Sequence, residues 1–159
     1  MSELAPSRRA VWGCLWLSLA CGDDERAKEL PFFPADYAAS YVEVRNCRPS
    51  GDHNLSLVRV LADPDTASAY LERDQGFEVG ALLVKAEYDF ADTECQGDIV
   101  RWTVMRRLLE GSSADTLDWD WQDVDAARRV ASTNDSRCIG CHTGCGVPPV
   151  GYLGTCTED

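Results

Sequence analysis

Two cysteines and a histidine near the C-terminus have a spacing that indicates specific chemistry. Cys138 and Cys141 are three residues apart, and His142 follows the second cysteine directly. This C-x-x-C-H pattern is the attachment motif of a c-type haem. The two thiols bond to the vinyl groups of one porphyrin, and the histidine becomes an axial ligand of its iron. The sequence therefore predicts one covalently bound haem c, with His142 as the metal ligand.

Two other uses of these cysteines stay open at this point. Thiolates and imidazoles are also the usual ligands of zinc, so the motif and the nearby Cys145 could form a zinc or iron–sulfur site. Cys138, Cys141 and Cys145 could instead belong to disulfides. The export signal described below favours haem, because haem is attached to such motifs outside the bacterial cytoplasm.

The composition indicates one acidic domain with additional processing segments. A chain of 159 residues is long enough for a single domain with a real core. Its formal net charge of −12 argues against nucleic acid as a partner. Eight cysteines are too many for a typical cytosolic domain of this size, so the composition predicts an oxidising compartment.

Residues 1–20 have the features of an export signal. Arg8 and Arg9 provide the positive start, and the apolar run 10–20 has the length of a signal-peptide core. This run is too short to span a bilayer. We therefore expect an exported protein, in the periplasm or on the cell surface of a bacterium.

Cys21 ends a Ser-Leu-Ala-Cys sequence that resembles a lipobox, in which the cysteine is acylated and becomes the mature N-terminus. We expect lipidation at Cys21, so that the protein contacts the membrane only through this lipid. Cleavage nearby without lipidation is the alternative. Residues 21–35 are charged, contain prolines and lack periodicity, which predicts a tether. Residues 36–159 then form the haem domain.

The middle of the chain has strand-like periodicity and few strong helix signals. Segments with the composition or alternation of strands are 41–47, 55–61, 77–88, 99–109 and 117–124. Short helical segments are expected at 34–40, 63–73 and 125–131. The fold class is therefore α+β, a mainly antiparallel sheet with a few short helices. We expect the tail from residue 143 to be irregular.

Two cationic residues lie on the predicted strands. Arg59 shares a strand face with leucines, so burial of that face would require an anionic partner, such as a haem propionate. On a half-exposed face its guanidinium would instead reach water. Lys85 shares the face of its strand with Leu83 and Glu87.

Four further cysteines have no role in the haem motif or the signal. They are Cys47, Cys95, Cys145 and Cys156, which allow three disulfide pairings. We favour Cys47 with Cys95 and Cys145 with Cys156, because the second pair closes a short loop beside the haem motif.

Several stretches of the chain, taken in order, resemble the cytochrome P-460 family, also written P460. They read LSLVRV (55–60), GALLVKAEY (80–88), WTVMRRL (102–108), WDW (119–121) and CIGCH (138–142). The family includes hydroxylamine-oxidising enzymes and the gas-binding β-type cytochromes c-prime. The resemblance implies a mostly antiparallel β fold, a homodimer and one five-coordinate haem c.

The resemblance also suggests roles for individual residues. His142 matches the proximal ligand, and Lys85 looks like the lysine that cross-links to the porphyrin edge in the catalytic members. Arg59 matches an arginine of the haem pocket, so Lys85 and Arg59 are the predicted catalytic and haem-contacting residues. The family's distal carboxylate should fall near Glu110, where this loop differs, so that role stays open.

The sixth coordination position of the iron decides the function. Met105 or His53 in that position would give an electron carrier, whereas an open position allows ligand chemistry. We expect an open site that binds or oxidises a small nitrogenous ligand, such as hydroxylamine or nitric oxide. Whether the protein is an enzyme stays open, and a redox protein is a candidate partner. A domain without haem, stabilised by disulfides or zinc, is the remaining alternative.

Overall fold

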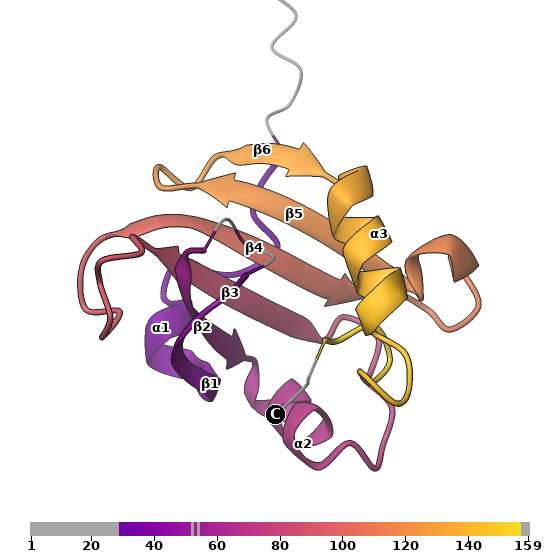
Figure 1. Cartoon of the computed structure of the whole chain (residues 1–159). Coiled ribbons are helices and arrows are strands. Elements are labelled where there is room, and N and C mark those ends of the chain that lie inside the picture. Colours follow the sequence, from indigo (N-terminus) through magenta and orange to yellow (C-terminus); the bar gives the residue numbers. More distant parts are fainter. Residues whose placement is uncertain (1–28, 52, 54, 157–159) are drawn as a thin grey trace, which may run out of the picture.

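A computed structural model of the chain describes residues 29–51, 53 and 55–156 (Figure 1). The predicted signal, the lipidation at Cys21 and most of the tether lie outside the described residues. Within the described part, no helix is both long and apolar enough to cross a membrane.

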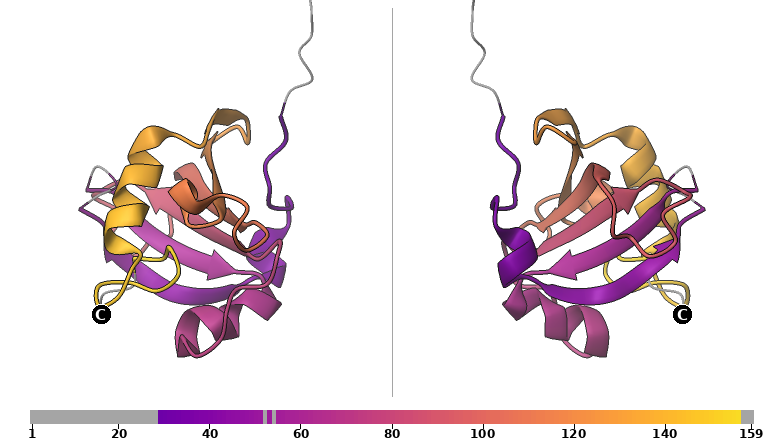
Figure 2. Two further views of the ribbon diagram at one scale, coloured as in Figure 1. Left: turned by 90° about the vertical axis from the view of Figure 1, so that its right-hand side faces the viewer. Right: turned by 90° about the vertical axis from the view of Figure 1, so that its left-hand side faces the viewer.

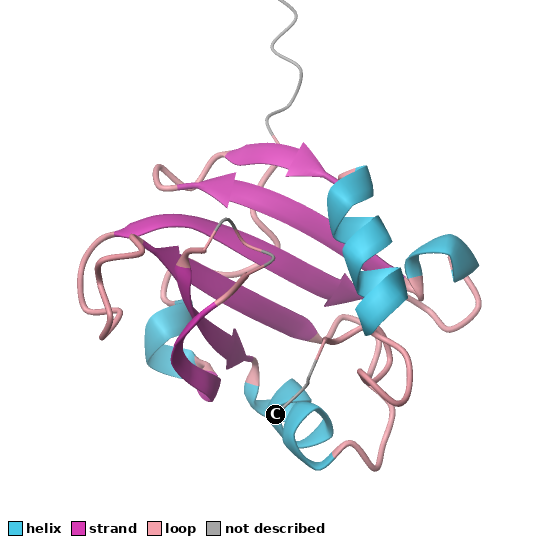
Figure 3. Ribbon diagram, in the orientation of Figure 1, coloured by secondary structure: helices cyan, strands magenta, loops and turns pink. Residues whose placement is uncertain are grey.

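The domain is built on one antiparallel sheet of six strands, whose order in the sheet is their order in the chain (Figure 3). The strands are β1 Val42–Pro49, β2 Leu57–Ala62, β3 Leu82–Tyr88, β4 Ile99–Arg107, β5 Trp119–Asp125 and β6 Val130–Thr133. The predicted α+β class with a mainly antiparallel sheet is therefore confirmed. β6 is a difference, because residues 125–131 were expected to form a helical turn. Instead Asp125 opens a tight turn, in which the Arg128 amide donates to its carbonyl, and the chain returns as a strand.

Three short α-helices and one 3₁₀ turn accompany the sheet: α1 Tyr37–Ser40, α2 Pro64–Glu72, α3 Ser136–Cys145 and η1 Ala114–Thr116. α2 begins with a capping residue followed by proline, since the Asp63 side chain accepts from the Thr66 amide at 3.1 Å. α3 also begins with a capping aspartate, Asp135, which accepts from the Arg137 amide at 2.8 Å. The haem motif therefore lies on a helix that runs two residues beyond the expected start of the irregular tail.

The two faces of the sheet are covered by different parts of the chain. Figure 2 shows α3 and the C-terminal segment on one side and α1 on the other. We call the α3 side the pocket face and the α1 side the closed face. Because side chains alternate along a strand, each strand contributes every second residue to each face.

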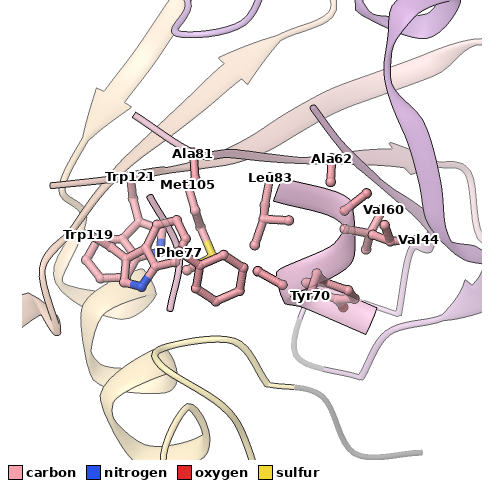
Figure 4. Packing of buried hydrophobic residues seen from close by; sticks show 12 residues of the cluster. Val44, Val60, Ala62, Tyr70, Phe77, Ala81, Leu83, Met105, Trp119 and Trp121 are labelled. Carbon is pink, nitrogen blue, oxygen red and sulfur yellow. The ribbon is translucent and has the colours of Figure 1, made fainter. Parts of the chain in front are cut away.

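Each face has its own apolar core. The pocket-face core is Val44, Val60, Ala62, Ala67, Ala69, Tyr70, Phe77, Ala81, Leu83, Met105, Trp119 and Trp121 (Figure 4). The closed-face core is Phe33, Tyr37, Leu57, Leu61, Val84, Ala86, Tyr88, Cys95, Trp102, Val104 and Val124. Figure 4 shows the two tryptophans of the first core near Met105 and Phe77, at the opposite end from Tyr70.

Two disulfides tie loops to this framework. Cys47 of β1 is bonded to Cys95 in the connection between β3 and β4, and Cys145 at the end of α3 is bonded to Cys156. This is the pairing favoured from the sequence. The second disulfide closes the C-terminal tail onto α3, next to the haem motif.

Candidate functional site

A pocket lies between α3 and the pocket face of the sheet. Its lining combines the haem motif (Cys138, Cys141 and His142) with Lys85 of β3 and residues of β2, β4 and β5. The connection between β1 and β2 contributes His53. Four of the five predicted haem-contacting residues thus meet in one place, although they lie up to 57 positions apart in the sequence.

The helical conformation of α3 brings the two motif cysteines to the same side. Residues three apart in a helix are neighbours on its surface, so Cys138 and Cys141 both reach the pocket. Both are free thiols, the first half-buried and the second exposed. Burial raises the pKa of the Cys138 thiol, and the negative charges of Asp135 and Asp123 raise it further. These two cysteines are therefore available for attachment of a group in the pocket.

The orientation of His142 is set by the C-terminal tail. Its Nδ1 lies 2.7 Å from the carbonyl oxygen of Gly154, and a carbonyl only accepts, so Nδ1 carries the hydrogen. Nε2 is then the nitrogen with a lone pair for a metal. The imidazole ring also lies 5.8 Å from the ring of Trp121, measured between ring centroids.

Gly154 is required for this arrangement by its backbone and by its neighbours. Its φ of +90° lies in the region that favours glycine, and a Cβ there would come within 2.6 Å of Trp119 Nε1. The same indole nitrogen donates to the Leu153 carbonyl at 2.6 Å. With the Cys145–Cys156 disulfide, these contacts hold the carbonyl that orients His142. The sequence analysis did not find this role, although three glycines between two cysteines were a signal of close backbone packing.

A chain of polar contacts crosses the pocket face beside α3. Lys85 Nζ lies 2.9 Å from His53 Nε2, and His53 Nδ1 lies 2.9 Å from Glu87 Oε1. Glu87 is fully buried, whereas His53 is half-buried. His53 was expected to be a surface residue or a haem ligand, and its part in this contact chain was not predicted.

Glu87 is held by two residues of β4. Arg101 Nε donates to Glu87 Oε2 at 2.8 Å, and the Thr103 hydroxyl donates to Oε1 at 3.2 Å. Burial by itself raises the pKa of Glu87, but the hydrogen bonds from His53 and Arg101 lower it below the ordinary carboxyl value. Glu87 is therefore ionised at neutral pH.

Asp123 of β5 is the second carboxylate that lines the pocket. It accepts from Arg101 Nη1 at 3.3 Å. Burial raises the pKa of Asp123, and the nearby negative charge of Glu87 adds to this against the opposing effect of Arg101. The pocket thus contains one carboxylate with a lowered pKa and one with a raised pKa.

Arg59 is not in this pocket. It lies on the closed face, where it pairs with Glu43 of β1, and its neighbour across β3 is Ala86. Lys85 instead faces Val60, so Arg59 and Lys85 point to opposite sides of the sheet. The arginines that line the pocket are Arg101 and Arg137, and the predicted haem contact of Arg59 finds no support in this geometry.

Two other residues considered from the sequence have different surroundings. Glu110 is exposed in the turn after β4 and is not among the pocket-lining residues. Met105 lines the pocket but is packed into the core between its strand neighbours Leu83 and Trp121.

The zinc alternative loses one of its ligands in this structure. Cys145 is bonded to Cys156, so its thiolate is not available to join the motif. Within the described ranges, no group of three or more His, Cys, Asp or Glu side chains is arranged to hold a metal ion. A haem iron needs fewer ligands from the protein, because the porphyrin supplies four ligands and a single histidine can suffice.

The pocket residues fit a haem in their chemistry. Two free thiols and a histidine whose Nε2 carries the lone pair stand on one wall, and apolar side chains including Trp121 and Leu83 form part of another. The buried Nε1 of Trp121 has no hydrogen-bond partner among the described residues, so the pocket retains a donor for a bound polar group. Arg101 and Arg137 are positioned in the lining as cations for carboxylates.

A comparison with protein-family models gives one family, described as cytochrome P460, which matches residues 34–146. The chain belongs to the cytochrome P460 family. This confirms the resemblance seen in the sequence, and membership in the cytochrome P460 family implies a haem cofactor. The matched range ends one residue after α3 and so includes the whole pentapeptide and Lys85. A search of curated protein sequences finds no match to the chain.

Proposed function

We propose that this protein is an exported cytochrome with one haem c, whose open sixth position binds or oxidises a small nitrogenous ligand such as hydroxylamine or nitric oxide. The observation that carries this proposal is the meeting of Cys138, Cys141, His142 and Lys85 in one pocket. The first three residues would hold the haem and its iron. Lys85 would modify the haem edge, as the family resemblance suggests.

The contacts of the two competing iron ligands support an open position. Both ring nitrogens of His53 are already engaged, one by Glu87 and the other by Lys85. Met105 is 8 % exposed and packed within an apolar cluster. An electron carrier with either residue as second ligand would need these contacts to be broken, so this function is the weaker candidate.

The remaining pocket residues have roles that follow from their charges. A bound haem supplies an iron that takes electrons or binds a small ligand. Arg101 and Arg137 would pair with haem carboxylates. Oxidation of hydroxylamine releases protons, and Asp123, whose pKa is raised chiefly by burial, is better suited to hold a proton than an ordinary carboxylate.

Export is part of the proposal. Two disulfides in the described chain support an oxidising compartment, and the signal-like residues 1–20 with Cys21 support a lipid-anchored protein of the periplasm or cell surface. The proposed macromolecular partners are a second copy of the chain, which the family resemblance suggests, and a redox protein.

The test is production of the full chain in a bacterial host that exports and matures c-type cytochromes. We expect the peptide with Cys138 and Cys141 to gain the mass of one haem, and the reduced spectrum to change with carbon monoxide. The Cys138→Ala, Cys141→Ala double variant is the control and should gain no such mass. A colourless wild-type protein contradicts the haem proposal, and a low-spin spectrum indifferent to carbon monoxide contradicts the open site.

Two further measurements separate an enzyme from a binding protein. Hydroxylamine added with an electron-accepting dye should reduce the dye if the protein is an oxidoreductase, and should leave it oxidised if it only binds ligands. A Soret band shifted strongly to long wavelength would indicate the Lys85 cross-link. Lys85→Ala should return that band to shorter wavelength, and no change would exclude Lys85 from that role.

A further inference from the structure

We propose that His53, held by Glu87, is the base that takes a proton from Lys85 and so presents the Lys85 amine to the pocket as a neutral nucleophile. His53 and Glu87 are then positioning residues that act through Lys85. The use of this amine on a haem rests on the function proposed above. The proton transfer itself rests only on contacts within the described chain.

The direction of each hydrogen bond follows from the chemistry of the three groups. An ionised carboxylate only accepts, so His53 Nδ1, 2.9 Å from Glu87 Oε1, must carry a hydrogen. His53 Nε2 then has the lone pair that faces Lys85 Nζ at 2.9 Å. The ring therefore stands between a fixed anion and an amine, with its basic nitrogen directed at the amine.

The short distance between Lys85 and His53 permits one proton between the two nitrogens. A protonated lysine facing a protonated imidazole would place hydrogens against each other and two positive charges side by side. Two arrangements remain, an ammonium donating to neutral His53 or a neutral amine accepting from an imidazolium. Transfer of the proton from Nζ to Nε2 converts the first into the second, and it needs no other reactant.

Glu87 makes the second arrangement accessible. The carboxylate stands at Nδ1, where it balances the positive charge that His53 gains when Nε2 takes the proton. Arg101 and Thr103 fix the carboxylate by donating to it from β4, so its position does not depend on the loop that carries His53. The Glu87 side chain is fully buried, so water does not compete for its carboxylate oxygens.

The other charges around the amine come from each element that lines the pocket. β4 and β5 contribute Arg101 and Asp123, which pair with each other, and the start of α3 contributes Arg137 and Asp135. The neighbours of Lys85 on the adjacent strands are uncharged, namely Val60 on β2 and Thr103 on β4. His53, with its Nε2 at 2.9 Å, is a base in direct contact with Lys85.

The experiment measures the reactivity of the Lys85 amine in the full chain matured with haem. An acetylating N-hydroxysuccinimide ester is added at a series of pH values, and peptides are quantified by mass spectrometry. Lys28, the other lysine of the sequence, is the reference in every sample. The same spectra report the fraction of Lys85 already joined to haem and the haem mass at Cys138 and Cys141.

His53→Gln is the decisive variant, because an amide can hydrogen-bond to both neighbours but is not a base. We expect Lys85 in this variant to be acetylated at least about tenfold more slowly than in wild type at neutral pH, or joined to haem to a correspondingly smaller extent. The pH profile should also shift upward. Ser50→Ala removes a hydroxyl from the same loop and pocket lining but keeps the backbone carbonyl that accepts from the His53 amide, so it should behave like wild type.

The outcomes separate this inference from the proposed function. Equal acetylation profiles and equal joining to haem in wild type and His53→Gln would overturn the inference, while haem mass at the motif would leave the proposed function intact. Absence of haem mass would overturn the proposed function, while a slower, shifted acetylation profile in His53→Gln would still support the relay.

Discussion

The two faces of the sheet are made from the same strands, but one is a closed apolar core and the other carries a pocket with charged side chains. On the closed face, Trp102 and Val104 pack beneath Phe33 and Tyr37, and the Trp102 indole donates to the Tyr37 hydroxyl at 2.7 Å. A buried polar side chain of this face, Gln122, accepts from the Phe32 amide and donates to the Leu30 carbonyl of the N-terminal segment. This face is sealed by chain that comes before the first strand.

The pocket face is sealed over only part of its area. Near α2 it is an apolar core, but toward the end of β3 and the start of β4 it presents Lys85, Glu87 and Arg101, with Asp123 on β5. Charged groups away from water destabilise a fold unless each has a partner, and here they are paired across strands. The comparison teaches that one face serves stability, whereas the other holds polar chemistry in fixed positions.

Substitution of adjacent β4 residues should separate the faces most strongly. Trp102→Ala creates a cavity in the closed face and should lower the free energy of unfolding by about 3–5 kcal/mol. Thr103→Ala, one residue on, removes one hydrogen bond to Glu87 and should lower it by about 1 kcal/mol. Denaturant unfolding measures both. Equal losses would contradict the division into a sealed and a functional face.

Glu87→Gln should show that the pocket face depends on pH. The pKa of Glu87 is lowered in the folded state, so its stabilising contribution exists above the ordinary carboxyl range and is lost as pH falls through the lowered value. At neutral pH the variant should be less stable by about 1–3 kcal/mol, because Arg101 and His53 lose a charged partner.

The difference in unfolding free energy between wild type and Glu87→Gln should therefore narrow as the pH is lowered from about 5. Chemical denaturation at several pH values measures this difference. Glu43→Gln, on a half-exposed pair with Arg59, is the matched control and should lower the stability at neutral pH by less than Glu87→Gln does. If the difference in unfolding free energy between wild type and Glu87→Gln stays constant from neutral to acid pH, the assigned ionisation of Glu87 is contradicted.

Arg59→Ala is expected to have the smallest effect. Its partner Glu43 is about as exposed as Arg59 itself, at 34 % of each side chain, so the ion pair should stabilise the protein by less than about 1 kcal/mol. The haem content and the absorption spectrum should not change, since Arg59 lies on the closed face. Arg101→Ala, on the pocket face, should alter the spectrum. An altered spectrum in Arg59→Ala would contradict this placement and indicate that Arg59 contacts the haem.

The sequence predicted those features that depend on residues close together in the chain. The spacing of Cys138, Cys141 and His142 indicated haem attachment without any tertiary information, and the order of strand-like segments indicated an antiparallel sheet. The short loop between Cys145 and Cys156 pointed to their disulfide. Each of these signals is local, so periodicity or spacing could reveal it.

Contacts between distant segments could not be read in this way. Alternation showed which residues share a face within one strand, but a shift of one residue in register moves every side chain to the opposite face. Only the pairing of Val60 with Lys85 puts Arg59 and Lys85 on opposite faces. His53, in a loop without periodicity, gave no signal of its contact with Glu87, and Gly154 gave none of its contact with His142.

By itself, the order of residues indicated where a porphyrin would be attached, that the middle of the chain forms strands and which thiols were left to pair. Tertiary structure alone decided which charges surround the attachment site and which side of the sheet receives it. The reason is that the spacing of a motif depends only on residues that are close in sequence, whereas charges become buried and paired only when strands from distant positions pack together.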